Sequence, residues 1–399
     1  MPADQRSNLT PRERVRLALD HKEPDRVPLD LGSTGNTGIT ALAYRELLNH
    51  LGIKAEVVVW DRMQQLAVTD ERVLLRLGID TRGLWLGGPE KRPDRFLDGD
   101  SYEDEWGVVR SRPPDGFYYD LVRSPLAGDI TEGDVRSFPW PDPEDPGRFK
   151  GVAEKARQIG QNTPYALVVH AAAGFITRSQ YLRGFEDWFM DVVAQPDLVG
   201  LILDHTLEWQ MAIVERMLRE VGEYADVVML GDDIGAQGGP LVSPATYRKV
   251  LKPRQAKLFA LVHSLTSAKV LYHTCGSVID LLDDLIEIGV DVLNPVQVSS
   301  ARMDTAELKR RFGNRLSFWG GIDTQRVMPL GTPEEVRAEA RKRIADLAPG
   351  GGYVVDTVHN IQADVPPENI VALYEEAARV GQYPLEHRPI SPTRGCQRP

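Results

Sequence analysis

Residues 269–296 read KVLYHTCGSVIDLLDDLIEIGVDVLNPV. Two apolar runs of strand length, Lys269–His273 and Asp291–Val296, enclose a segment in which apolar residues recur with helical spacing. A strand, a helix and a second strand in this order are typical of a parallel sheet whose connections are helices. The stretch therefore predicts a β-α-β unit with polar side chains at the end of its first strand.

The same alternation recurs along the chain and predicts an α/β fold, a (β/α)8 TIM barrel, because eight strands of this kind can be counted. We expect one barrel domain over residues 10–385 and a flexible C-terminal tail over residues 386–399. Besides the two strands above, the expected strands are Val27–Leu31, Asp80–Leu86, Tyr165–Ala171, Asp226–Gly231, Leu316–Gly320 and Tyr353–Thr357.

A long stretch, about residues 87–161, separates the second and third expected strands and is rich in Pro, Gly, Asp and aromatic residues. Within it, Trp106–Arg112 and Gly116–Val122 alternate in polarity around a Pro-Pro-Asp turn, which predicts a β-hairpin. An insertion here rises from the face of a barrel that carries the active site. We expect it to form a lid over that site, or else to be a decorative insertion or one that forms a homodimer.

Composition limits the partners of the chain. Its net charge is -11, and no run of Lys and Arg suits a phosphate backbone, so we expect no nucleic acid partner. Residues 1–30 are charged throughout, and no later segment has eighteen uninterrupted apolar residues. We therefore expect a cytoplasmic protein with no membrane partner.

The chain has only two cysteines, Cys275 and Cys396, and the second lies in the polar tail, so no disulfide is expected between them. Cys275 follows His273 by two positions at an expected strand end. In extended chain both side chains then point to one side, where they can reach a single zinc ion. The alternative is a core thiol beside a hydrogen-bonded histidine.

His359 follows the last expected strand and is the third candidate ligand. Three protein ligands with an open fourth position are the pattern of a catalytic zinc site. The alternative is a general acid or a substrate-binding histidine that works without a metal. Asp232 and Asp233 follow the fourth expected strand, where either can complete the metal shell, orient a histidine, or act as an acid or base.

Other polar or aromatic residues at strand ends are expected to shape a substrate pocket. His170 ends the third expected strand, although a histidine there is often satisfied by a backbone carbonyl. Gln297, Trp319 and Asp323 lie just after the sixth and seventh expected strands. We expect His170, Gln297 and Trp319 to bind substrate.

Several segments resemble the uroporphyrinogen decarboxylase superfamily, which includes cobalamin-linked methyltransferases. The likeness covers residues 10–380 and implies a TIM barrel. The segments that carry it are Pro11–Val15 (PRERV), Glu23–Pro28 (EPDRVP), Ser179–Asp187 (SQYLRGFED), Leu241–Pro244 (LVSP), Gly320–Asp323 (GGID) and Val365–Ile370 (VPPENI).

Two branches of the superfamily match different residues. The decarboxylases resemble the chain at His359, which precedes a Pro-rich helix opening, but their Arg-Gln-Ala-Gly-Arg segment is replaced here by Leu31–Gly38 (LGSTGNTG). Without those arginines the carboxylates of a porphyrinogen lack their partners. The methyltransferases resemble the chain at His273-Thr274-Cys275, their zinc-binding His-x-Cys, while His359 stands here in the place of their later cysteine.

The resemblance to the methyltransferases implies a zinc-dependent enzyme that moves a methyl group between a small methylated or methoxylated substrate, or a thiol, and a corrinoid protein. Zinc and a corrinoid (cobalamin) would be the cofactors, the corrinoid supplied by a separate partner protein. One alternative is a metal-free decarboxylase that uses His359 and an aspartate. Another is a catalytically silent barrel that binds a small molecule.

Overall fold

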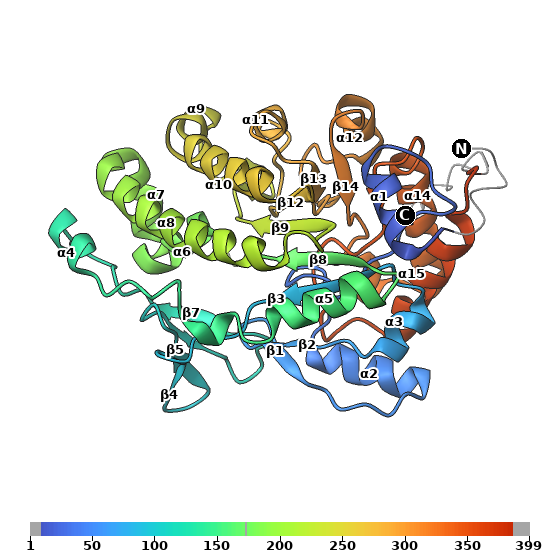
Figure 1. Ribbon diagram of the computed structural model, residues 1–399, viewed down its shortest axis with the longest axis horizontal. Coiled ribbons are helices and arrows are strands. Elements are labelled where there is room, and N and C mark those ends of the chain that lie inside the picture. The colour runs from blue at the N-terminus through green and yellow to red at the C-terminus, as the bar shows by residue number, and fades with distance from the viewer. Residues whose placement is uncertain (1–8, 172–173, 386–399) are drawn as a thin grey trace, which may run out of the picture.

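The computed structural model of the chain describes residues 9–171 and 174–385 and is built around a seven-stranded parallel sheet (Figure 1). The expected tail at residues 386–399, with Cys396, lies outside the described residues. In spatial order the strands are β3 (Thr81–Trp85), β8 (Ala166–His170), β9 (Val227–Gly231), β12 (Lys269–His273), β13 (Val292–Asn294), β14 (Ser317–Trp319) and β15 (Tyr353–Val354).

Both faces of the curled sheet are buried, because successive side chains of a strand point to opposite faces. On one face, residues such as Val168, Met229 and Leu271 form a small cluster with Val15 and Leu19 of helix α1 (Pro11–Leu19). The other face packs against the surrounding helices. Helix α1 contacts both β8 and β15 and so closes the sheet at the amino ends of its strands.

The helices lie along the outer face of the curled sheet (Figure 1). Their starts follow the local chemistry of the sequence: Thr10 caps α1, and Thr332 caps α14, each in a capping box with a glutamate three residues later. The other long helices are α2 (Ala41–Leu51), α5 (Val152–Asn162), α6 (Phe175–Arg183), α7 (Phe185–Ala194), α8 (Pro196–Val221), α10 (Lys252–Leu265), α12 (Thr305–Phe312), α14 (Pro333–Leu347) and α15 (Pro367–Val380).

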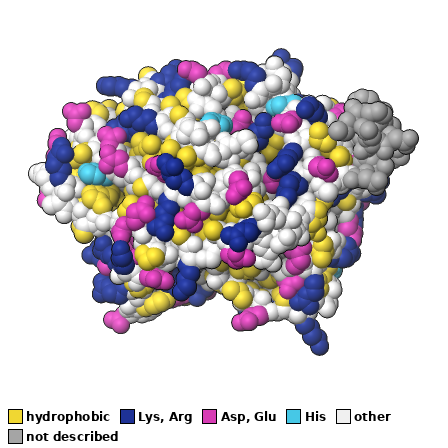
Figure 2. Space-filling model, viewed as in Figure 1, with side chains coloured by type: hydrophobic (Ala, Val, Ile, Leu, Met, Phe, Trp, Pro, Cys, Tyr) yellow, Lys and Arg dark blue, Asp and Glu magenta, His cyan; other side chains and the backbone are white. Residues whose placement is uncertain are grey.

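Short helices complete the connections. They are α3 (Glu71–Leu77), α4 (Glu132–Ser137), α9 (Pro244–Thr246), which runs into a π-turn at Tyr247–Leu251, α11 (Leu282–Glu287) and α13 (Val327–Leu330). Within the described ranges, no helix is both long enough and apolar enough to cross a lipid bilayer. On the face shown in Figure 2, Lys and Arg side chains are interspersed with Asp and Glu.

The first expected strand, Val27–Leu31, is not a regular strand. Leu29 forms a single parallel bridge to Val355 beyond β15, and on its other side the Leu29 carbonyl accepts a hydrogen bond from the Asp80 amide before β3. Pro28 has no amide hydrogen to give to a ladder, so the pairing is interrupted. The segment nevertheless lies between the two edges of the seven-stranded sheet.

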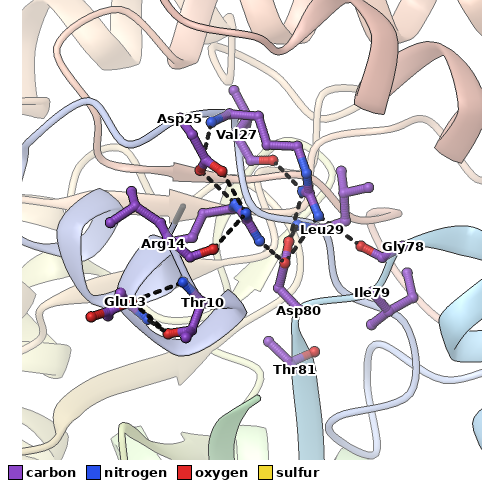
Figure 3. A network of polar contacts seen from close by, with 12 residues as sticks. Thr10, Glu13, Arg14, Asp25, Val27, Leu29, Gly78, Ile79, Asp80 and Thr81 are labelled. Atoms are coloured by element: carbon purple, nitrogen blue, oxygen red, sulfur yellow. Dashed lines mark hydrogen bonds and ion pairs between the residues drawn. The ribbon is translucent and has the colours of Figure 1, made fainter. Parts of the chain in front are cut away.

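The buried carboxylate of Asp80 ties this segment to the sheet (Figure 3). It accepts hydrogen bonds from Arg14 Nη1 at 2.6 Å, Arg26 Nη1 at 2.8 Å and the Leu29 amide at 2.8 Å. Arg14 also makes a bidentate pair with Asp25, at 2.7 and 2.6 Å. One carboxylate therefore joins β3, α1 and the Asp25–Leu29 segment.

The stretch between β3 and β8 carries a four-stranded antiparallel sheet of β4 (Arg95–Leu97), β5 (Ser101–Glu103), β6 (Val109–Ser111) and β7 (Asp120–Arg123). β6 and β7 lie where the hairpin was expected and pair antiparallel. Trp106 and Trp209 join a separate apolar cluster that packs this sheet against α6 and α8. Two short antiparallel pairs of strands lie elsewhere: β1 (Val59–Asp61) with β2 (Leu66–Ala67), and β10 (Gly235–Ala236) with β11 (Gly239–Pro240).

The Asp80 network predicts a large loss of stability in Asp80→Asn. The carboxamide keeps the shape but removes the negative charge that the guanidinium groups of buried Arg14 and half-buried Arg26 share. We expect the free energy of unfolding to fall by about 3–5 kcal/mol, measured by urea denaturation. Asp142→Asn, which removes a surface ion pair with Lys91, is the control and should change stability little. Equal effects of the two substitutions would show that the attachment of the Asp25–Leu29 segment to the sheet does not depend on Asp80.

Candidate metal centre

The carboxyl ends of the parallel strands meet at one rim of the sheet. His273 ends β12, and its register partners on the two neighbouring strands are Gly231 of β9 and Asn294 of β13. His170 ends β8, and Trp319 ends β14. Polar residues that are far apart in sequence are therefore brought side by side, as expected for a parallel α/β sheet.

Three potential ligands converge at this rim. Ligand atoms of His273, Cys275 and His359 all lie within 4.8 Å of one another. Cys275 Sγ lies 3.5 Å from His273 Nε2. In a tetrahedral zinc site two ligand nitrogens are about 3.3 Å apart, and a nitrogen and a sulfur about 3.6 Å. The donors present therefore suit a zinc ion in type and in spacing.

Neighbouring amides decide which nitrogen of His273 is available. His273 Nδ1 lies 2.6 Å from Asn294 Oδ1, and Asn294 Nδ2 donates to the Trp319 carbonyl at 3.2 Å. Because the amide group of Asn294 is thus oriented with its oxygen toward the ring, Nδ1 carries the proton and donates. Nε2 is left with its lone pair directed to the site, which is the arrangement that metal-binding histidines show.

The three candidate ligands are neutral without a cation. Burial lowers the pKa of His273, and burial together with His273 lowers the pKa of His359 to about 4. Burial and the carboxylate of Asp233 raise the pKa of the Cys275 thiol. A bound divalent cation would compensate the thiolate charge that burial otherwise disfavours.

The two aspartates that follow β9 have different surroundings. Asp233 Oδ1 accepts a hydrogen bond from the Cys275 amide at 2.8 Å and so lies at the site. The Asp232 carboxylate is buried and accepts instead from the Thr177 amide of α6 at 2.8 Å. Burial raises the pKa of Asp232 to about 8. The structure therefore brings Asp233, and not the Asp232 carboxylate, up to Cys275.

His170 lies near His273 and contacts the loop at Gly32–Gly38. Its Nδ1 accepts a hydrogen bond from the Gly35 amide at 3.3 Å, and its ring meets Trp60 edge to face at 6.4 Å. Trp60 is in turn stacked on Trp85 at 4.4 Å. Burial and His273 lower the pKa of His170 to about 4, so the ring is neutral and carries its proton on Nε2.

The remaining expected pocket residues act from behind the rim. Gln297 Oε1 accepts from the Gly276 amide at 2.6 Å and holds the turn that follows Cys275. Trp319 is fully buried, and its indole donates to Asp30 Oδ2 at 3.0 Å. Asp323 accepts from the amides of Gln325 and Arg326 and shapes a turn. Gln297 and Asp323 thus stabilise turns, and the Trp319 indole is directed to Asp30, while the substrate contacts expected of Gln297 and Trp319 stay predictions.

The family of the chain follows from comparison with known proteins. A family model for uroporphyrinogen decarboxylase (URO-D) matches residues 125–380, which is more than half of the chain. The chain belongs to the uroporphyrinogen decarboxylase family. The match includes every candidate ligand of the metal centre.

Some relatives in this family are named as methyltransferases and others as decarboxylases. The methylcobamide:CoM methyltransferase MtaA of Methanosarcina barkeri is 28% identical over 232 residues, which are 57% of this chain and 62% of that protein. The uroporphyrinogen decarboxylase of Psychromonas ingrahamii is 25% identical over 247 residues, 59% of this chain and 65% of that protein. The chain thus spans somewhat less than two thirds of each. Family membership is therefore clear, while the reaction differs between its members.

A solved structure supports the fold of this family member. A methyltransferase from Methanosarcina mazei superposes with a TM-score of 0.65 and covers 93% of this chain and 99% of its own, at 19% identity. At this identity the likeness concerns the fold alone.

The sequence analysis did not predict a role for three residues at or beneath the site, Asn36, Asp30 and Asp356. Asn36 Nδ2 lies 3.1 Å from His273 Nε2 and 3.4 Å from His359 Nε2. The available signal was its place in the stretch Leu31–Gly38, which replaces the arginine-bearing segment of the decarboxylases. Asp30 and Asp356 are both fully buried, and no spacing rule points to acids within an apolar run.

The two buried acids lie beneath the rim. Asp30 accepts hydrogen bonds from Thr81 Oγ1 at 2.5 Å, Ser33 Oγ at 2.8 Å and the Trp319 indole. Asp356 Oδ2 has no hydrogen-bond partner in the described part of the chain. Burial, reinforced by the charge of Asp30, raises the pKa of Asp356. The pKa of Asp356 therefore lies well above the ordinary carboxyl value, which favours its protonated form in the folded chain.

This protonation predicts a pH dependence of stability. A carboxyl whose pKa is raised by folding holds its proton in the folded chain above pH 4, where the unfolded chain releases it, so its contribution makes the free energy of unfolding fall as the pH rises above about 4. In Asp356→Asn this contribution is absent. We expect the variant to lose less stability than the wild type between about pH 5 and about pH 8, measured by urea denaturation.

Asp129→Asn makes the same change of formal charge at an exposed position and is the matched control. Its stability should follow the wild-type curve. A wild-type slope that persists unchanged in Asp356→Asn would show that this acid is ionised in the folded chain.

Proposed function

We propose that the chain is a zinc-dependent methyltransferase that transfers a methyl group between a small methylated or methoxylated substrate, or a thiol, and a corrinoid protein. The observation that carries this proposal is the convergence of His273, Cys275 and His359 within 4.8 Å at the strand rim. The catalytic unit would be a single barrel over residues 10–385, with the Leu29 segment in the eighth strand position. The corrinoid would be supplied by a partner protein that docks over the rim.

The name of one relative and the composition of one loop support this proposal. One relative is named a methylcobamide:CoM methyltransferase, and the family model matches residues 125–380, which include all three ligands. The loop at Gly32–Gly38, whose Asn36 contacts both imidazoles, contains only Gly, Ser, Thr and Asn. A substrate with many carboxylates would lack arginine partners there.

The residues of the chain have defined tasks in this mechanism. His273 and His359 would hold the ion through Nε2, and Cys275 through Sγ. Zinc supplies Lewis acidity, which stabilises negative charge on an oxygen or sulfur that loses or gains the methyl group. Asn294 keeps the proton of His273 on Nδ1, and Gln297 holds the turn after Cys275.

Proton movement at this site falls to Asp233. Its carboxylate is hydrogen bonded to Cys275, and its charge opposes ionisation of the thiol. When a cation binds, the thiol must release its proton, and Asp233 is the neighbouring base that can accept it. Asp232, a buried acid hydrogen bonded to α6, would hold the loop that carries Asp233. His170, with its proton on Nε2, would donate a hydrogen bond to substrate.

Metal analysis tests the proposal. Protein purified with supplementary zinc should contain about one zinc per chain. Cys275→Ala and His273→Ala should each lose most of the zinc, and with it demethylation of methoxylated or methylated substrates in the presence of a reduced corrinoid. His50→Ala, at an exposed position of α2, is the matched histidine control and should keep both. Wild-type protein without zinc after this purification would contradict the proposal and favour the metal-free decarboxylase or a silent barrel.

A further inference from the structure

The loop that carries Asn36 is held rigidly against the rim. The Asn36 and Thr37 amides donate to Thr34 Oγ1 at 3.1 and 3.2 Å, and the Gly32 amide donates to the Thr37 carbonyl at 2.6 Å. Asn360, next to His359 in sequence, accepts from the Gly38 amide at 2.7 Å. These bonds give the Asn36 side chain a defined position over the three candidate ligands.

The end of the Asn36 side chain lies at the fourth corner of the site. Its Nδ2 atom is 3.1 Å from His273 Nε2 and 3.4 Å from His359 Nε2. Ligand atoms on a shared tetrahedral zinc ion are about 3.3 Å apart when they are nitrogen or oxygen. With Cys275 Sγ at 3.5 Å from His273 Nε2, three of these separations have the lengths of tetrahedral edges.

The orientation of the Asn36 amide fits a site without a cation. Its N–H group can donate to the lone pair of His273 Nε2, because the proton of that ring is engaged by Asn294. A half-turn about the last side-chain torsion, which is a soft torsion, exchanges Nδ2 for Oδ1. Among the residues that the structure describes, no hydrogen bond restrains Oδ1, so the turn gives up only contacts to lone pairs that a cation would then occupy.

From this geometry we infer that Asn36 is the exchangeable fourth ligand of the metal centre, through Oδ1. The inference rests on the proposed zinc site and extends it. A carboxamide oxygen is neutral and binds zinc more weakly than imidazole or thiolate does. It therefore closes the site at rest and leaves first when a substrate donor arrives.

The charge of the site indicates which donor displaces Asn36. Two neutral imidazoles, one thiolate and one neutral carboxamide leave a net charge of +1 on a zinc centre. This residual charge favours an anionic oxygen or sulfur, such as a phenolate, an alkoxide or a thiolate, in the fourth position. An aspartate in place of Asn36 would cancel that charge and hold the position more firmly.

Metal affinity and cobalt spectra test the inference on the full-length protein. Zinc affinity is measured by competition with a chelator for the wild type, Asn36→Leu and Asn36→Asp. We expect Asn36→Leu to bind zinc roughly tenfold or more weakly, and Asn36→Asp to bind it at least as tightly as the wild type. Asn49→Asp adds the same charge at an exposed position of α2 and should match the wild type.

The visible spectrum of the Co(II)-substituted protein reports on the ligands directly. We expect it to differ between the wild type and both Asn36 variants. Titration with 2-mercaptoethanol should change the wild-type spectrum, and Asn36→Asp should need a higher thiol concentration for the same change. If Asn36→Leu does not fold, as judged by circular dichroism, Asn36→Asp, which keeps the size of the side chain, still decides.

The outcomes separate this inference from the proposed function. A wild type that binds no zinc overturns the proposed function. If the wild type binds zinc, three results would each overturn the role of Asn36 and leave the three-ligand site intact. They are an unchanged zinc affinity in Asn36→Leu, a lower zinc affinity in Asn36→Asp, and identical cobalt spectra of the wild type and the variants. A wild-type cobalt spectrum that does not change when thiol is added overturns the proposed exchange of Asn36 for substrate.

Discussion

The buried carboxylate of Asp80 is the constraint on which the rest of the molecule depends. The parallel sheet has two edges, and the segment between them offers too few backbone bonds to join them, because Pro28 interrupts its pairing. Asp80 supplies the missing connection by binding Arg14, Arg26 and the Leu29 amide at once. These contacts hold the Leu29 segment between the two edges of the curled sheet, whose strand ends converge at the rim.

A chain of hydrogen bonds links the metal centre to the buried interior. His273 donates to Asn294, Asn294 donates to the Trp319 carbonyl, and the Trp319 indole donates to Asp30. Each member orients the next, so the direction of the Nε2 lone pair depends on a carboxylate buried in the sheet. Such supporting partners commonly set how well a metal site works. The core of this protein is therefore part of the site and not only its support.

The three candidate ligands at the rim are neutral without a cation, and the carboxylate of Asp233 beside them favours a positive ion. The histidines are neutral, and the thiol is kept protonated by burial and by Asp233. The loop at Gly32–Gly38 carries an asparagine, whereas the resemblance to the decarboxylases implies arginines in this segment. A positive side chain in that place would repel a metal ion, whereas a carboxamide can serve it. Under the proposed function, this loop favours metal chemistry over the binding of a substrate with many carboxylates.

Local chemistry by itself determined the elements and the polar strand ends. Apolar runs of strand length lie where β8, β9 and β12 form, Thr10 and Thr332 start helices through side-chain caps, and the two-residue spacing of His273 and Cys275 places both on one side of the chain. These features depend only on residues that are close together in the chain, so the sequence is enough to predict them.

Only the tertiary structure decided which distant residues meet. His359 and Asn36 reach His273 because the sheet closes on itself, and Asp233 rather than the Asp232 carboxylate faces Cys275 because α6 supplies the amide that binds Asp232. Trp319 faces Asp30 in the interior instead of a pocket for the same kind of reason. The direction in which a side chain points at a strand end is set by packing partners far away in the chain, and no spacing rule contains them.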